Sequence, residues 1–201
     1  VEDPAAFEFE RLNELFDFAA LGRAFRQKFP KKRIALNTMN GGASGLAPQI
    51  LEAMGFTDEN SRAFNTTFMN DPSMKKTVME FVEGPGGKQV RFAPDPTRAW
   101  FRGKDYDAYM AQDLANTIAM LIDGDADRLV LEHLGEISPN QIGPMIKFYL
   151  NRYLKDQNPN YVDARTVPTT SAMDLLNKAL GVAAPKVTDV GSKNFVPFLG
   201  D

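Results

Sequence analysis

Residues 117–131 of the chain read TIAMLIDGDADRLVL. The apolar runs at 117–122 and 129–131 are typical of buried β-strands, because they are short and almost without charge. We therefore expect residues 123–128 to form the loop that joins these two strands.

Three acidic residues alternate with small residues in this loop. Asp123, Asp125 and Asp127 stand at every second position, so their carboxylates can point to one side of an extended chain. Gly124 and Ala126 are small, which lets the backbone curl around an ion. Three carboxylates this close repel one another, so a cation or a cationic partner is required. Carboxylate oxygens suit a hard divalent cation, and we expect Mg2+.

The next residue, Arg128, carries a guanidinium group that can bind a phosphate through two parallel hydrogen bonds. Two other interpretations of the loop stay open: a plain acidic surface turn, and an aspartyl nucleophile loop with Asp123 as nucleophile and Asp125 as acid/base. An EF-hand calcium loop is excluded. Its sixth and twelfth positions require Gly and Glu, and these places hold Arg128 and Leu134.

The composition is that of an ordinary globular protein, with 43% hydrophobic and 24% charged residues. A net charge of -3 without a dominant basic face excludes a general nucleic-acid binder. No apolar run is long enough to span a bilayer and no signal segment is visible, so we expect no membrane association. The absence of cysteine excludes disulfides and thiolate metal sites and is compatible with the cytoplasmic location that we expect. The chain starts at Val1 rather than Met, and we expect it to be a piece of a longer protein.

The first part of the chain predicts a helix, a strand, a glycine turn and a second helix. Apolar residues at steps of three and four predict a helix over residues 5–28. A strand at 33–37 runs into the glycine-rich segment 39–45, which is followed by a helix at 46–54. The backbone N–H groups of such a turn can bind an anion. A tight turn that needs positive φ explains the glycines equally well.

Strands and helices continue to alternate after the acidic loop, which indicates an α/β fold. The elements expected are a helix at 106–114, a junction at 135–139, a helix at 140–154, strands at 162–167 and 186–190, and a helix at 172–180. Thr170 or Ser171 can cap the last helix, and Gly181 can end it. Thr169 and Thr170 stand at the N-terminus of that helix, where their hydroxyl groups can either bind a phosphate or cap the helix.

The segment DGDADR at 123–128, placed after an apolar strand, resembles the metal-binding loop of the α-D-phosphohexomutases, the superfamily of phosphoglucomutases and phosphomannomutases. The segment LFDFAAL at 15–21, with the strand and glycine turn that follow it, is similar to the phosphoglucomutase branch. PDP at 94–96 and RTVPTTSAMD at 165–174 extend the resemblance, the latter to the Arg-Ser-Met-Pro-Thr stretch of the family. Gly-Ser-Lys at 191–193 takes the place of the family's Gly-aromatic-Lys, with a serine in the aromatic position.

The resemblance implies two consecutive α/β domains, each a mixed sheet flanked by helices, as in phosphohexomutase domains 2 and 3. Residues 1–134 would form domain 2 with the metal-binding loop, and residues 135–201 an incomplete domain 3. The family's enzymes have four domains around one cleft. The first carries a phosphorylated serine and the fourth a phosphate-clamping loop, and we expect these missing domains 1 and 4 to be partners of the chain.

The resemblance also implies an isomerase that moves a phosphoryl group between O1 and O6 of a hexose through a bisphosphorylated intermediate. Asp123, Asp125 and Asp127 would hold Mg2+, and Arg128 would be the catalytic residue of the chain. The substrate-binding residues, expected to contact a hexose phosphate or bisphosphate, are Arg128, Thr169, Thr170 and Lys193. We expect the isolated chain to be inactive. A non-catalytic metal-binding domain derived from a mutase and an aspartyl-phosphate phosphotransferase are the alternatives.

Overall fold

The computed structural model describes residues 3–57, 59–66, 82–83, 89–90, 96, 102–154 and 163–198. The chain divides into two compact units, Val1–Ile137 (unit 1) and Ser138–Asp201 (unit 2), and each is described by itself. Of the segment at 94–96 only Pro96 is described, and it is buried; the other two residues lie outside the described ranges.

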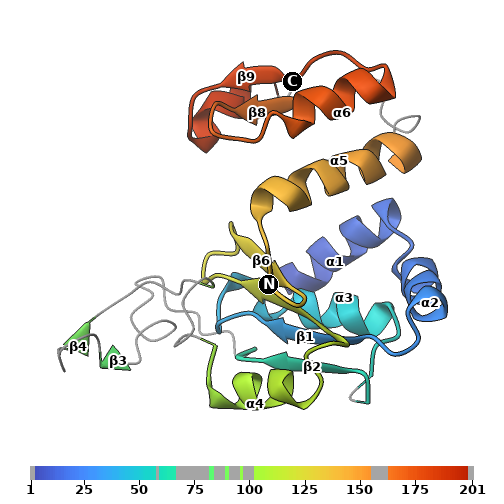
Figure 1. Ribbon diagram of the computed structural model, residues 1–201, viewed down its shortest axis with the longest axis vertical. Coiled ribbons are helices and arrows are strands. Elements are labelled where there is room, and N and C mark those ends of the chain that lie inside the picture. The colour runs from blue at the N-terminus through green and yellow to red at the C-terminus, as the bar shows by residue number, and fades with distance from the viewer. Residues whose placement is uncertain are drawn as a thin grey trace. The chain divides into compact units, whose positions relative to one another are not determined.

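Unit 1 combines helices with a five-stranded mixed sheet (Figure 1). Its helices are α1 (Pro4–Leu15), α2 (Phe18–Lys28), α3 (Ala47–Ala53) and α4 (Lys104–Gln112). Its strands are β1 (Arg33–Asn37), β2 (Ser61–Phe64), β3 (Val82–Glu83), β4 (Gln89–Val90), β5 (Thr117–Ile122), β6 (Leu129–Glu132) and β7 (Glu136–Ile137). Strands β3 and β4 form a separate antiparallel pair.

The sheet has the strand order β2-β1-β5-β6-β7. Strand β1 pairs in parallel with both β2 and β5, while β6 pairs antiparallel with β5 and β7. The α/β class and the mixed sheet flanked by helices are therefore confirmed. Because β2, β1 and β5 are parallel, the segments that follow them emerge at one edge of the sheet, where α/β folds commonly bind ligands.

The two faces of the sheet carry separate apolar cores, because successive side chains of a strand point to opposite faces. One core joins β1 and β5 to α2 and α3; its buried members are Ile34, Leu36, Leu51 and Phe56. The other lies under α4, and its largest residues are Phe64, Tyr106, Tyr109 and Leu121. The rings of Phe64 and Tyr106 meet edge to face, with centroids 5.6 Å apart. The two cores hold the strands, and thus the shared edge, in place.

The single helix expected over residues 5–28 is wrong, because the structure has two helices, α1 and α2, that meet at Phe16 and Asp17. The side chain of Asp17 accepts a hydrogen bond of 2.8 Å from the backbone N–H of Ala20 and so caps α2. The apolar periodicity continues across the break, since the rings of Phe9 and Phe18 still stack with centroids 5.9 Å apart. The apolar periodicity alone therefore gave no indication that a second helix begins at Phe18.

Helix α2 packs against the end of α3 through a glycine. A Cβ added to Gly22 would lie 1.8 Å from the carbonyl oxygen of Met54, so the position accepts no side chain without a shift. Arg26, one turn later, donates a hydrogen bond to the same carbonyl. These contacts hold the C-terminal end of α3 against α2.

Unit 2 contains α5 (Pro139–Leu154), β8 (Ala164–Thr166), α6 (Ala172–Leu180), β9 (Lys186–Thr188) and a 3-10 helix at Ser192–Phe198. The described strands β8 and β9 pair in parallel. Gly181 ends α6 in the left-handed conformation, as expected. A buried ion pair joins Lys147 of α5 to Asp163 just before β8, and Asn177 of α6 donates to the same carboxylate oxygen at 2.8 Å. Within the described ranges, no helix has the length and apolar character that crossing a membrane requires.

Candidate metal site

The acidic loop is a tight turn between the antiparallel strands β5 and β6. Its backbone closes by two hydrogen bonds, from Asp123 N–H to Arg128 O at 3.3 Å and from Ala126 N–H to Asp123 O at 3.2 Å. Ala126 has a φ of 62°, in the left-handed region. This turn brings one carboxylate oxygen each from Asp123, Asp125 and Asp127 within 4.8 Å of one another. The strands and the joining loop predicted from the sequence are therefore observed.

Asp123 is the buried member of the three acids, whereas Asp125 and Asp127 are exposed. One carboxylate oxygen of Asp123 accepts the backbone N–H of Arg128 at 3.0 Å, and the other accepts Arg128 Nε at 2.6 Å. The same Nε lies 3.5 Å from Asp127 Oδ1. Arg128 is thus a cationic partner of the kind that three neighbouring carboxylates require, and this role was not predicted from its phosphate-binding chemistry.

The donor set fits a magnesium ion. Mg2+ binds carboxylate oxygens at about 2.1 Å, so oxygens that share the ion lie roughly 3–4 Å apart. The spacing of at most 4.8 Å in the acidic loop is close to this requirement. Each carboxylate oxygen has two lone pairs, so the hydrogen bonds from Arg128 to Asp123 leave acceptor capacity for a cation.

The glycine-rich turn after β1 lies directly against the acidic loop. A Cβ added to Gly41 would lie 2.4 Å from Gly124 O and 2.6 Å from Gly124 Cα, and the N–H of Gly42 donates to Gly124 O at 2.9 Å. Neither explanation considered for these glycines accounts for this contact. Positive φ occurs at Met39 and Asn40 instead, with values of 51° and 57°. The N–H groups of Gly41 and Gly42 are engaged within the protein rather than directed at an anion.

A buried polar network supports the glycine turn from its other side. Asn37 and Thr38, at the end of β1, are completely buried. Thr38 Oγ1 donates to Asn65 O at 2.7 Å, and Asn65 Nδ2 donates to Asn37 Oδ1 at 3.1 Å. Asn37 Nδ2 donates to Arg102 O at 3.0 Å. The network therefore joins the ends of β1 and β2 to the segment that precedes α4.

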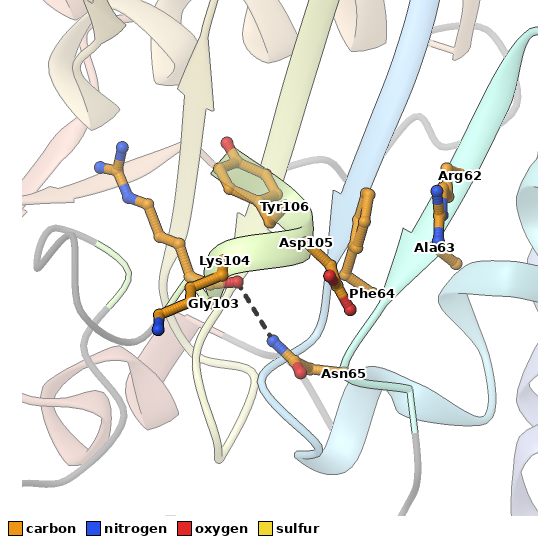
Figure 2. Close-up of a pocket in the computed structure, with 9 residues that line it drawn as sticks. Arg62, Ala63, Phe64, Asn65, Gly103, Lys104, Asp105 and Tyr106 are labelled. Carbon is orange, nitrogen blue, oxygen red and sulfur yellow. Dashed lines mark hydrogen bonds between the residues drawn. The ribbon is translucent and has the colours of Figure 1, made fainter. Parts of the chain in front are cut away.

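A pocket of about 320 Å³ opens beside this network, between the end of β2 and the first turn of α4 (Figure 2). It is lined by Arg62, Ala63, Phe64, Asn65, Arg102, Gly103, Lys104, Asp105 and Tyr106. Figure 2 shows the Asn65 amide at the wall of the pocket. Its Nδ2 donates a hydrogen bond to the backbone oxygen of Arg102 at 3.4 Å.

Two of the cationic side chains that line this pocket, Arg102 and Arg62, already have partners. Arg102 binds Glu132 through two contacts of 2.7 and 3.2 Å, and the Tyr106 hydroxyl donates to Glu132 Oε2 at 3.2 Å. Burial and the neighbouring Glu132 carboxylate raise the pKa of Tyr106 above its ordinary value, so the hydroxyl remains a donor. The guanidinium of Arg62 lies over the ring of Phe64, 5.3 Å from its centroid.

The other sequence-predicted site residues lie in unit 2. Thr170 Oγ1 accepts the N–H of Ala172 at 3.2 Å and caps α6, which is one of the two roles considered for it. Thr169 Oγ1 lies 2.8 Å from the hydroxyl oxygen of Thr166. Lys193 is exposed on the 3-10 helix after β9. Since β8 and β9 are parallel, these residues follow the same edge of their sheet.

The loop that carries Thr169 and Thr170 is bracketed by an ion pair. Arg165 Nε and Nη2 lie 3.2 and 2.8 Å from the two carboxylate oxygens of Asp174. This bidentate pair joins β8 before the loop to α6 after it. The contacts of Gly41 and Asn65 in unit 1, and the Arg165–Asp174 ion pair in unit 2, were not predicted from the sequence, because each joins separate elements of the fold.

A scan against protein-family models finds no match, and a search of curated proteins finds none either. Among solved structures, the chain is similar to the exocytosis-sensitive phosphoprotein pp63/parafusin of Paramecium, a phosphoglucomutase in its open form, with 21% identity and a TM-score of 0.63. That match covers 96% of this chain and 30% of the Paramecium chain. A phosphoglucomutase/phosphomannomutase family protein of Burkholderia thailandensis has 19% identity and a TM-score of 0.54, over 84% of this chain and 31% of that one.

The chain thus spans less than a third of the length of either solved structure. At these identities the likeness concerns the fold, and the chain has the fold of this part of the phosphoglucomutase and phosphomannomutase proteins. The resemblance to the phosphohexomutases, which the sequence of the acidic loop indicated, is therefore confirmed at the level of the fold.

Proposed function

We propose that this chain supplies the metal-binding part of a phosphohexomutase, a Mg2+-dependent enzyme that transfers a phosphoryl group between O1 and O6 of a hexose phosphate. Residues 1–134 would be its second domain and residues 135–201 part of its third. One observation carries the proposal: three carboxylates converge within 4.8 Å at the carboxyl edge of a sheet whose fold is shared with mutases.

The acidic loop would hold the ion through Asp123, Asp125 and Asp127. A bound Mg2+ ion would neutralise the negative charge that develops on a transferred phosphoryl group. Arg128 would orient the phosphate or the neighbouring hydroxyl. Its side chain is 53% exposed and is held at Nε by the buried Asp123, so it is both accessible and fixed in direction.

In unit 2, Thr169, Thr170 and Lys193 would contact the hexose phosphate or bisphosphate. Their common position after two parallel strands supports this role, as does the ion pair that fixes the threonine loop. The flexible side chain of Lys193 ends in an ammonium group, which can pair with a phosphate. The remaining partners would be the first and fourth domains of the same enzyme.

A metal titration followed by a phosphate titration tests the proposal. We expect the 201-residue chain to bind Mg2+ in calorimetry and Asp125→Ala to lose at least tenfold in affinity. With Mg2+ present, Arg128→Ala should weaken the binding of glucose 1-phosphate seen by NMR, whereas Lys178→Ala, an exposed cation on α6, should not. A chain that binds Mg2+ no better than its Asp125→Ala variant would overturn the proposal.

Turnover separates this function from a non-catalytic metal-binding domain derived from a mutase. The chain alone should not turn over glucose 1-phosphate with a bisphosphate primer. A complete mutase that contains these residues should do so and should lose turnover with Asp125→Ala. If the complete protein binds Mg2+ and never turns over a hexose phosphate, the non-catalytic alternative is correct.

A further inference from the structure

We infer that Gly41 and Asn65 are positioning residues of the acidic loop, which hold the turn after β1 against Gly124 and so set the spacing of the three carboxylates. The consequence for metal binding rests on the proposed function. The structural part rests only on contacts within unit 1.

The backbone of the turn after β1 approaches the backbone of the acidic loop closely. Gly41 leaves no room for a Cβ, which would lie 2.4 Å from Gly124 O, 2.6 Å from Gly124 Cα and 2.7 Å from Gly124 C. These are backbone atoms, so a side chain at position 41 cannot be accommodated by a rotamer change. Gly124 stands between Asp123 and Asp125, and any displacement of its peptide moves both carboxylates. The size of residue 41 therefore controls the geometry of the acidic loop.

Asn65 supports the turn after β1 on the side away from the acidic loop. Asn65 O accepts the Asn40 N–H at 2.5 Å and the Thr38 hydroxyl at 2.7 Å. Asn65 Nδ2 donates to Asn37 Oδ1, which also accepts the Met39 N–H at 3.0 Å. Met39 and Asn40 occupy the left-handed region, which non-glycine residues adopt only where the surroundings impose it. Asn65 thus fixes a turn that could not hold its shape alone.

Metal affinity should depend on how precisely the three carboxylates are placed. Mg2+ requires near-ideal octahedral geometry, and residues that orient its ligands typically contribute 10- to 100-fold to metal affinity. Gly41→Ala should therefore lower affinity at least tenfold. Gly42→Ala is the matched control, because its Cβ would lie 3.8 Å from Gly124 O and 3.9 Å from Ala126 Cβ, which is ordinary contact. The metal affinity of Gly42→Ala should stay within twofold of that of the wild type.

The experiment titrates the full 201-residue chain with Mn2+, followed by electron paramagnetic resonance, because Mn2+ accepts the same oxygen ligands as Mg2+. In parallel, 1H–15N spectra without metal report the amides of residues 123–127. We expect Gly41→Ala to weaken Mn2+ binding and to shift these amides, and Gly42→Ala to do neither. Wild-type affinity and unshifted amides in Gly41→Ala would overturn the inference.

A second variant keeps the test decisive if Gly41→Ala does not fold. Asn65 itself has a φ of 51°, which Asp also tolerates. Asn65→Asp therefore keeps the backbone conformation but replaces the N–H donor to Asn37 Oδ1 with an acceptor. It should shift the same amides and lower Mn2+ affinity several-fold, and wild-type behaviour would refute the role of Asn65. If the wild type itself binds no Mn2+, the proposed metal site fails. In that case, the shifts of the amides of residues 123–127 without metal are the test of whether Gly41 and Asn65 position the acidic loop.

Discussion

Replacing Asp123 with Asn removes a charge without removing volume, and the structure allows its effect to be estimated. At 4.8 Å in water, each like-charge pair costs about 0.9 kcal/mol, so the variant relieves roughly 2 kcal/mol of repulsion from Asp125 and Asp127. It also loses the ion pair with Arg128. Because Arg128 is 53% exposed, this pair contributes about 1 kcal/mol. The two effects oppose each other, and we expect the stability without Mg2+ to change by at most about 1–2 kcal/mol.

With Mg2+ present, the two proteins should differ. At a concentration 100 times Kd, binding adds about 2.7 kcal/mol to the wild type, which corresponds to a rise in Tm of roughly 5–10 °C. Asp123→Asn should show almost no rise, because a charged ligand is lost. Thermal unfolding followed by circular dichroism, with and without Mg2+, measures both quantities. Asp189→Asn, an exposed charge in unit 2, is the control. An equal Mg2+-dependent rise in Asp123→Asn and wild type would refute the reasoning.

Two further predictions, each with a comparison variant, concern the stability of the two units. Gly22→Ala should destabilise unit 1 by about 1–3 kcal/mol in urea unfolding, because the new Cβ would overlap Met54 O. The control is Gly143→Ala in unit 2. Its Cβ would meet nothing within 4 Å, so this variant should not destabilise unit 2. Asp163→Ala should cost unit 2 about 3–5 kcal/mol, since it removes the carboxylate that neutralises the buried ammonium of Lys147. Lys147→Met should cost less, and an equal loss in the two variants would contradict this account.

The sequence predicted elements whose signal is local. The strands at 33–37 and 117–122 have the predicted bounds, because their apolar runs end at polar residues. The end of α6 at Gly181 also follows from local conformation. The break at Asp17 was not predicted, because the apolar periodicity continues across it. The local signal for this helix start is Asp17 itself, a residue type that commonly caps helices by accepting the backbone N–H three positions later.

The reason for Gly41 could not be predicted from the sequence. A glycine required by positive φ and a glycine required by close approach are identical in a single sequence, and the residue that approaches Gly41 comes from a distant segment. The sequence predicted that the acidic loop needs a cation, but it did not predict which residue supplies one. The need for a cationic partner was clear, yet the pairing of Arg128 with Asp123 depends on the turn that Ala126 permits at a φ of 62°.

The burial of Asp123 bears on the aspartyl-nucleophile alternative. A nucleophile must present a carboxylate oxygen in line with a phosphorus atom that carries three other oxygens, so it needs open space around it. Asp123 has no exposed surface, and Arg128 donates to both of its oxygens, at 3.0 and 2.6 Å. An ion needs only one lone pair from Asp123, offered beside the exposed oxygens of Asp125 and Asp127. The same burial that obstructs an attacking group therefore favours a fixed ligand, and trapping with a metal fluoride should leave Asp123 without a covalent phosphate analogue.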